Sequence, residues 1–337
     1  MLAYAAMATA RGDRGLTDVP GFRVGHATDP RGLTGCTVIL CGDGAVPGID
    51  VRGLATGLRD PGPCDPGHLV PAIHALLLSG GSAYGLDAAA GVMSYLEERR
   101  IGFRLRQAVV PIVPAAILFD LAVGDRRARP TPSMARRACL NASSLAVPQG
   151  NIGAGTGATV GKLHGMERAM KAGLGSASVR RGPLVVGALA VVNAWGDVID
   201  PSTGRILAGL RDAPRGTRRV GMAGVLKGGG RPRAVRRRDS VPSSTTLGVV
   251  ATNARLTKVE ATAVARLAQV AYARCISPVG TRYDGDVIFC LSRGSVRADS
   301  LQVGMLAIDA MQEAIMGAAL AARGVPGLPA ARDLDAR

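Results

Sequence analysis

The pattern of hydrophobic positions before residue 245 predicts a strand-rich part of the molecule. Residues 36–54 alternate apolar runs with Gly-Asp-Gly and Pro-Gly turns, which is typical of successive strands. Residues 80–100 carry apolar side chains at helical spacing and predict a helix, while residues 108–113 form a short apolar strand. A long apolar run over residues 184–193 predicts a buried strand that ends at an asparagine.

After residue 245 the pattern alternates strands with helices. It predicts strands over residues 247–252 and 286–292, and helices with an apolar stripe over residues 258–275 and 300–322. Strands followed by amphipathic helices imply a layered α/β architecture, in which helices cover the faces of a sheet.

The composition indicates one or two globular domains. The chain has 337 residues, of which 47% are hydrophobic and only 3% aromatic, so small and branched side chains build its core. Six cysteines and four histidines lack the spacing of metal ligands, and we therefore expect no metal and no cofactor. The first residues lack a basic start and a sustained apolar stretch, which predicts a cytoplasmic protein without a signal peptide or membrane span.

The charge of the chain is unusually positive. The formal net charge is +16 at pH 7, and much of the excess comes from arginines in residues 211–238, which surround Gly228-Gly229-Gly230. This composition predicts a basic flexible linker over residues 211–244. A nucleic-acid partner is one explanation of such charge, but the segment has no aromatic side chains for base stacking, which disfavours it.

Residues 243–252 place hydroxyl side chains where the basic segment becomes an apolar, β-branched run. Cleavage between Ser244 and Thr245 would leave one residue with a nucleophilic hydroxyl and a free α-amine, whose ordinary pKa is about 7.7–8.0. Such an amine acts as a base beside its own nucleophile. Threonine pairs also begin ordinary strands, so this stretch alone fits both interpretations.

Two aspartates and a lysine are candidate partners of this threonine. Asp284 and Asp286 flank a glycine directly before an apolar run, so they form either a solvated turn or a pair at the mouth of a core strand. Close carboxylates disfavour double ionisation and attract an ammonium group. Lys162 ends a glycine-dense tract that lacks the spacing of a phosphate-binding loop, and Leu163 replaces the metal-binding hydroxyl, which disfavours nucleotide binding.

Two further residues are candidates for stabilising an oxyanion. Asn193 ends the apolar run over residues 184–192, where a neutral amide donates a hydrogen bond without disturbing nearby pKa values. Asparagines at strand ends also cap turns. Tyr84 lies in the segment Gly80–Asp87 and has either a hydrogen-bonding role or a packing role at the start of the predicted helix.

Several ordered motifs resemble the DmpA-type family, which contains L-aminopeptidase/D-esterases, β-peptidyl aminopeptidases and nylon-oligomer (aminohexanoate-oligomer) hydrolases. These motifs are residues 15–26, 35–40, 80–87, 245–253 and 284–286. The resemblance implies an N-terminal-nucleophile-hydrolase-like α/β fold, a four-layer αββα sandwich. Residues 1–337 would form a single hydrolase fold, with residues 1–244 and 245–337 as associated fragments after self-cleavage. Family members are oligomers, so a homo-oligomer of four or more subunits is expected.

The resemblance also implies roles for the candidate residues. Thr245 would be the nucleophile, and Lys162 would assist its amine as a base. Asn193 and Tyr84 would stabilise the oxyanion.

The acidic pair bears on the branch of the family. Asp284 and Asp286 would orient the base and bias its charge, and such an Asp-x-Asp pair resembles the nylon-oligomer branch, whereas the aminopeptidase branch has Ser-x-Glu. Two positions depart from the family pattern. Ser244 precedes the nucleophile where Asn or Gly is frequent, and Asn253 stands where Asp is usual.

The expected function is therefore that of a self-processing amide hydrolase acting through an acyl-enzyme on small peptides or aminohexanoate-type oligomers. One alternative is an aminopeptidase or β-peptidyl aminopeptidase. A second is acyl transfer, as in the ornithine acetyltransferases, and a third is a basic binding protein that never cleaves.

Overall fold

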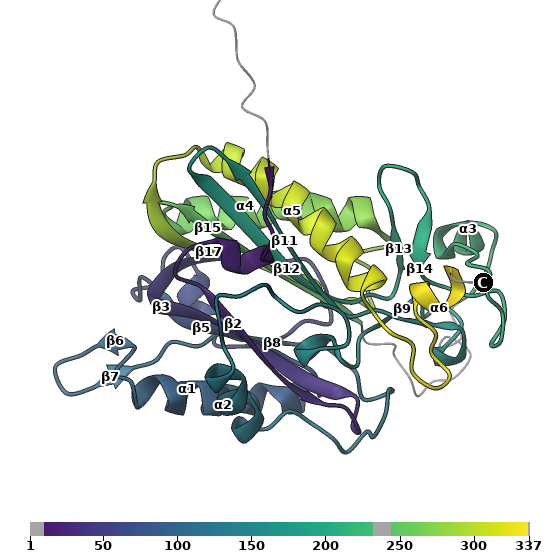
Figure 1. Ribbon diagram of the computed structural model, residues 1–337, viewed down its shortest axis with the longest axis horizontal. Coiled ribbons are helices and arrows are strands. Elements are labelled where there is room, and N and C mark those ends of the chain that lie inside the picture. Colours follow the sequence, from purple (N-terminus) through teal and green to yellow (C-terminus); the bar gives the residue numbers. More distant parts are fainter. Residues whose placement is uncertain (1–9, 232–243, 336–337) are drawn as a thin grey trace, which may run out of the picture.

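The computed structural model describes residues 10–231 and 244–335. Its elements form four layers, in which α4 (Lys258–Cys275) and α5 (Ser300–Leu320) cover one sheet while α1 (Ala89–Glu97) and α2 (Pro132–Leu140) cover the other (Figure 1). This arrangement confirms the predicted αββα architecture.

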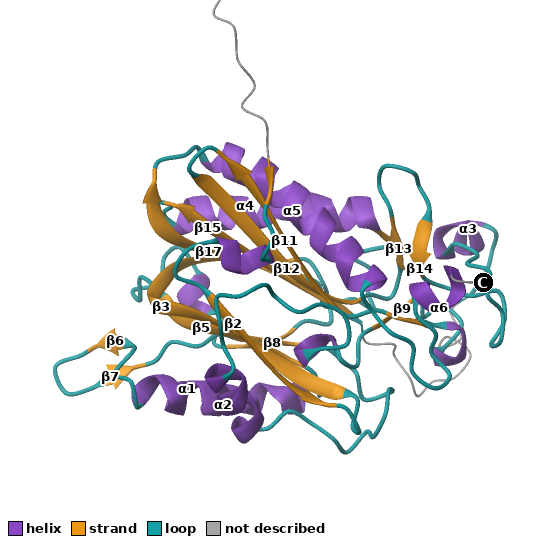
Figure 2. Cartoon of the chain, viewed as in Figure 1, coloured by secondary structure: helices purple, strands orange, loops and turns teal. Residues whose placement is uncertain are grey.

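The first sheet contains the predicted strand that ends at Asn193 and the two strands predicted after residue 245. Its strand order is β1-β11-β12-β15-β17-β3, and all neighbours are antiparallel except β15 and β17 (Figure 2). The bounds are β1 Ala10–Arg11, β11 Leu174–Arg181, β12 Leu184–Asn193, β15 Thr245–Ala254, β17 Val287–Val296 and β3 Thr34–Val51.

The second sheet begins on the same strand, β3. Residues 46–51 of β3 pair with β17 in the first sheet, whereas residues 34–40 pair with β2. On its other side β3 pairs with β5, which pairs with β8, and β8 pairs with β4. The bounds are β2 Arg23–Asp29, β5 Ile73–Ser79, β8 Ala115–Ile117 and β4 Gly57–Arg59. The pairing of β3 shifts between Leu40 and Ala45, where Gly42 has a φ of 63° and so permits the irregularity. The predicted succession of strands over residues 36–54 is therefore one long strand shared by two sheets.

Alternating side chains of the strands fill three apolar layers. In β12, Leu189 and Val191 point into the core between the sheets, while Ala188 and Ala190 face the layer beneath α4 and α5. Val38 of β3 packs towards α1 and α2. A strand buried on both faces has to be apolar throughout, which explains the unbroken run over residues 184–192.

Helix ends follow the capping residues of the sequence. Thr257 and Glu260 form a capping box at the start of α4. The Asp299 carboxylate caps α5, and Thr131 caps α2, whose first residue is a proline. The helix predicted over residues 258–275 is confirmed at both ends.

Two predicted elements are shorter than expected. Residues 80–100 begin as the 3-10 helix η3 (Ser82–Ala88) and become α-helical only at Ala89. Within η3, a side chain at Gly85 would come within 1.9 Å of the Gly80 carbonyl oxygen, so that turn is wound tightly. In residues 108–113 only Val109 and Val110 pair, because Pro111 lacks the N–H that a ladder requires.

Short elements complete the chain. They are β6 Phe103–Arg104, β7 Val109–Val110, β9 Thr159–Val160, β10 Met170–Lys171, β13 Asp197–Ile199, β14 Ile206–Ala208, β16 Ile276–Ser277, α3 Met222–Lys227, α6 Ala331–Asp335, η1 Gly15–Asp18, η2 Gly62–Cys64, η4 Gly153–Gly155 and η5 Met166–Arg168.

The first part of the predicted linker makes buried contacts. Arg211 is buried, and its guanidinium donates to the backbone carbonyls of Glu167, Ala169, Pro214 and Gly216. Met222 begins α3 and packs into a small apolar cluster. Residues 232–243 lie outside the described residues, and the flexibility expected of residues 211–244 stays a prediction.

By length and composition, one helix in the described part of the chain, α5, is apolar enough to cross a membrane. It contacts α4, β11 and β12, and its apolar face is buried against them. Core helices of globular proteins pass the same test.

Candidate active site

Three strands bring the candidate residues to one edge of the first sheet. β12 ends at Asn193, which pairs with Thr245 at the start of β15. β17 runs parallel to β15, with Val287 beside Leu247, so Asp284 and Asp286 precede β17 at the same edge. Residues that are far apart in the sequence thus lie together at one edge of the sheet.

The peptide between Ser244 and Thr245 is buried and held by several hydrogen bonds. Thr245 Oγ1 donates to the Ser244 carbonyl oxygen at 2.7 Å, and the Gly285 N–H donates to the same oxygen at 2.7 Å. The Ser244 N–H donates to the Tyr283 carbonyl at 2.9 Å, so Ser244 forms a parallel bridge beside Asp284. The nucleophile candidate and a backbone donor therefore meet at one carbonyl group.

Gly285 has no room for a side chain. A Cβ atom there would lie 2.7 Å from Thr245 Oγ1 and 2.6 Å from the Ala55 carbonyl oxygen. The aspartates on either side were candidates from the sequence, whereas this glycine was not. The signal was a glycine enclosed by two acids directly before a core strand.

Lys162 is buried beside the same peptide. Its Nζ donates to the Asn193 carbonyl oxygen at 2.9 Å, to Asn193 Oδ1 at 2.8 Å and to Ser244 Oγ at 3.2 Å. Burial lowers the pKa of Lys162 to about 7, the charge of Asp284 opposes this change, and the charge of Lys171 lowers the pKa further. A lysine with this pKa is substantially neutral at pH 7 and can accept a proton.

Asn193 orients the lysine. Its Oδ1 accepts from Lys162 Nζ and from the Thr159 N–H at 3.0 Å, while its Nδ2 donates to the Phe119 carbonyl at 3.0 Å. Within the described residues, no hydrogen bond joins this amide to the Ser244 carbonyl. The bond to that oxygen comes from the Gly285 N–H instead.

The two aspartates hold backbone rather than the lysine. Asp286 Oδ1 accepts the Thr246 N–H at 2.7 Å, and Asp284 accepts the Trp195 N–H at 3.1 Å. Burial and the charge of Asp284 raise the pKa of Asp286. Neither carboxylate forms an ion pair with Lys162 in the part of the chain that the structure describes, so they act on it across space.

Tyr84 forms no hydrogen bond with this cluster in the described part of the chain. It lies on η3, it is 56% exposed, and the Arg129 guanidinium stacks on its ring 3.5 Å from the centroid. Shared strand ends and hydrogen bonds thus group Thr245, Lys162, Asn193, Asp284 and Asp286, and Tyr84 is not part of this network.

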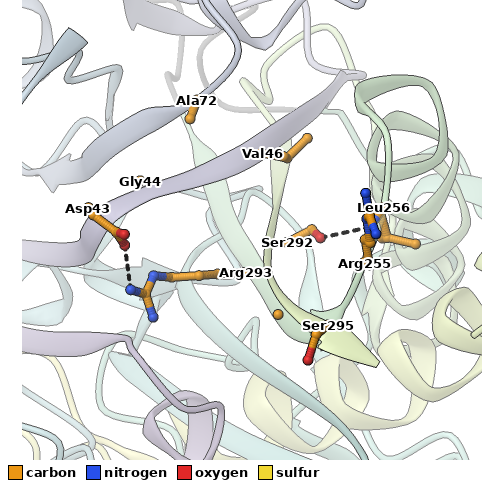
Figure 3. Close-up of a pocket in the computed structure, with 10 residues that line it drawn as sticks. Asp43, Gly44, Val46, Ala72, Arg255, Leu256, Ser292, Arg293 and Ser295 are labelled. Carbon is orange, nitrogen blue, oxygen red and sulfur yellow. Dashed lines mark hydrogen bonds and ion pairs between the residues drawn. The ribbon is translucent and has the colours of Figure 1, made fainter. Parts of the chain in front are cut away.

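A cavity of about 610 Å³ lies at the other end of β15 and β17 (Figure 3). Arg255, Ser292 and Arg293 line it, and Arg293 points towards Asp43. It is therefore separate from the polar cluster around Thr245. Among the described residues, no three His, Cys, Asp or Glu side chains come together as metal ligands.

Solved structures share this fold. The L-aminopeptidase D-Ala-esterase/amidase from Ochrobactrum anthropi, a variant of the Ntn hydrolase fold, superposes with a TM-score of 0.70 at 20% identity, covering 97% of this chain and 93% of that chain. A Burkholderia sp. β-aminopeptidase gives a TM-score of 0.66 at 21% identity, covering 94% and 90%. The predicted Ntn-hydrolase-like fold is confirmed.

The model of peptidase family S58 matches residues 14–332, and the chain belongs to this family. An uncharacterized aminopeptidase of Mycobacterium tuberculosis (strain ATCC 25618 / H37Rv) is 37% identical over 95% of this chain and 97% of its own. A 6-aminohexanoate-oligomer endohydrolase of Kocuria sp. (strain KY2) is 32% identical over 90% and 85%. The family and its named relatives make the chain a hydrolase of amide bonds.

Proposed function

We propose that the chain cleaves itself between Ser244 and Thr245, and that the freed Thr245 is then the nucleophile of amide hydrolysis. The observation that carries the proposal is the Ser244 carbonyl oxygen, which accepts from both Thr245 Oγ1 and the Gly285 N–H at 2.7 Å. Lys162 lies beside them as a buried base.

Self-cleavage then proceeds through an ester. Thr245 Oγ1 bonds to the Ser244 carbonyl carbon, its proton passes to Lys162, and the Gly285 N–H stabilises the charge that develops on the carbonyl oxygen. The C–N bond breaks, and the departing Thr245 nitrogen takes the proton from Lys162. Water hydrolyses the ester, which leaves a carboxylic acid on Ser244 and both a hydroxyl and an amine on Thr245.

Turnover repeats these steps with an external amide. The substrate carbonyl takes the place of the Ser244 carbonyl, and Thr245 Oγ1 attacks it while the Thr245 amine and Lys162 carry the proton. The amine product leaves, and water releases the acyl-enzyme. Asn193 holds Lys162 in place through its Oδ1.

Small peptides or aminohexanoate-type oligomers are the proposed substrates, as for the family members named above. The pairing of Ser244 with Tyr283 and Gly285 favours a peptide substrate. It therefore favours the aminopeptidase-like alternative. An α-amino-acyl group offers a carbonyl to Gly285 and an N–H to Tyr283, as Ser244 does. In a 6-aminohexanoyl group the nitrogen stands at the far end of a methylene chain, so it keeps only the bond to Gly285.

Intact mass and N-terminal sequencing of the purified protein test self-cleavage. We expect two fragments, the smaller beginning Thr-Thr-Leu-Gly, and an uncut, inactive chain for Thr245→Ala. Thr246→Ala is the matched control, because it keeps the backbone N–H that Asp286 binds, and it is expected to cleave. Turnover by the Thr245→Ala variant at the parent rate would refute the mechanism.

Substrate choice needs a separate comparison. Alanyl p-nitroanilide is expected to be hydrolysed faster than 6-aminohexanoyl p-nitroanilide. Isobutyryl p-nitroanilide, which replaces the amine of the alanyl group by a methyl group, is expected to lose that advantage. Equal rates for the alanyl and isobutyryl compounds would contradict recognition through Tyr283.

A further inference from the structure

A second buried lysine lies close to the site and has no role in the steps above. Lys171, in β10, is fully buried, and its Nζ donates to the backbone carbonyls of Ala158 at 2.6 Å and Ala172 at 2.9 Å. None of the ion pairs within the described residues includes it. A buried ammonium held only by neutral carbonyls is costly, and burial lowers the pKa of Lys171 to about 7.

A continuous chain of hydrogen bonds connects Lys171 with Lys162. The Ala158 carbonyl and the Thr159 N–H belong to the same peptide group. The carbonyl accepts from Lys171, and the N–H donates to Asn193 Oδ1 at 3.0 Å, which in turn accepts from Lys162 Nζ at 2.8 Å. One peptide group and one carboxamide thus separate the two lysines, and hydrogen bonds in such a chain polarise one another.

The backbone around Lys171 is fixed relative to this peptide. β10 pairs with β9, so that Lys171 stands opposite Thr159. The Ala172 N–H also donates to the Ala158 carbonyl at 3.1 Å, and the Lys171 N–H donates to the Pro329 carbonyl at 2.9 Å. Displacing the lysine would therefore shift the peptide that orients Asn193.

Charges of both signs act on Lys162. Asp284, Asp120 and Asp286 favour its ammonium form, and Lys171 is the cation that opposes them. Asp120 also faces Lys171. It is buried, and it accepts from the Gly81 N–H at 2.7 Å and from Thr34 Oγ1 at 2.6 Å.

We propose that Lys171 is a positioning residue of the reaction. It holds the peptide between Ala158 and Thr159 in line with Asn193. Its charge favours the neutral form of Lys162, which accepts the Thr245 proton. The inference rests on the proposed self-cleavage. It assigns a task to a residue that touches neither Ser244 nor Thr245 through any hydrogen bond of the described chain.

The pH dependence of self-cleavage tests this role. The uncut chain is purified in denaturant and refolded into buffers from about pH 5 to 10, and intact mass follows the rate. Thr245 has no free amine before cleavage, so it does not contribute to the rising limb of the profile. Lys162, Lys171 and Asp286 titrate in this range, and removing the like charge of Lys171 raises the pKa of Lys162. Lys171 loses its own charge as the pH rises through about 7. For Lys171→Met we therefore expect the limb to move up by less than about one pH unit, with a roughly two- to threefold slower rate at pH 7 that recovers at higher pH.

Two further variants separate charge from structure. Lys171→Arg keeps the positive charge, and its limb is expected near that of the parent. Asp120→Asn removes a carboxylate that favours the ammonium form, so its limb is expected to move to lower pH. This second variant decides the question if Lys171→Met does not refold, as judged by circular dichroism.

Each outcome has a distinct meaning. A lower plateau with an unshifted limb in Lys171→Met would leave only a structural role and would overturn the inference. An unshifted limb in Asp120→Asn would overturn it when Lys171→Met cannot be measured. A parent chain that stays uncut at every pH would instead remove the proposed function, and the inference with it.

Discussion

The two ends of the parallel pair β15 and β17 carry similar residues in opposite environments. At one end, Thr245 and Asp286 are each only 1% exposed, and Lys162 is buried with them. At the other end, Arg255 and Arg293 line an open cavity, and Asp43, the ionic partner of Arg293, is 89% exposed (Figure 3). Both ends combine basic, acidic and hydroxyl groups.

Burial, rather than an open cavity, is what changes the proton affinity of these groups. Water screens the pair of Asp43 and Arg293, so its interaction is worth about 0–1 kcal/mol. Around Lys162 the low dielectric changes proton affinity by several pKa units, from an ordinary value of 10.5 to about 7. The proposed first substrate is the peptide between Ser244 and Thr245, so that step needs no open pocket.

The largest expected effect is at the buried end, for Gly285→Ala. The added Cβ would stand 2.7 Å from Thr245 Oγ1 and close to the Ala55 carbonyl, so the nucleophile has to move. We expect self-cleavage to slow by at least about 100-fold, which is the loss seen when an oxyanion contact is removed. Intact mass against time measures it. Gly224→Ala, where a Cβ meets nothing within 4 Å, is the control, and an equal loss there would mean that the effect is not local.

A smaller effect is expected on the pH dependence of the free energy of unfolding, measured with the Thr245→Ala protein as the uncut parent. Lys171 has a pKa of about 7 in the folded chain and about 10.4 when unfolded. Between these values the unfolded chain binds more protons, so this lysine makes the free energy of unfolding rise with pH by about 1.4 kcal/mol per pH unit. Adding Lys171→Met removes that contribution.

Urea denaturation at pH 7, 7.5, 8 and 8.5 compares the two proteins. The free energy of unfolding of the double variant minus that of Thr245→Ala is expected to fall with pH by about 1.4 kcal/mol per pH unit. The buried cysteines, whose pKa values burial raises to about 12, contribute equally to both proteins and cancel. A constant difference would show that Lys171 is charged to the same extent in both states.

The smallest effect is expected at the exposed end, for Asp43→Asn. The loss of its exposed ion pair with Arg293 should change the free energy of unfolding by less than about 1 kcal/mol. The rate of self-cleavage should stay within twofold of the parent, because strand-length separation and solvent screen this charge from Lys162. A tenfold change in that rate would break the contrast between the two ends.

The sequence alone predicted much of the fold, because its signals were local. The apolar run that ends at Asn193 and the apolar stripe over residues 258–275 mark elements whose ends the structure reproduces. The prediction failed where close packing decided, as in the tight turn at Gly85.

The same division holds for the candidate site. The pattern of the sequence drew attention to Thr245, Lys162, Asn193 and the two aspartates at the ends of predicted elements, and the resemblance to a known family supplied their expected roles. Tertiary structure alone decided that Tyr84 stacks on Arg129, that the Gly285 N–H faces the Ser244 carbonyl, and that Lys171 connects to Lys162 through a peptide group. These contacts join residues distant in sequence, many through backbone atoms that every residue carries, so no residue pattern records them.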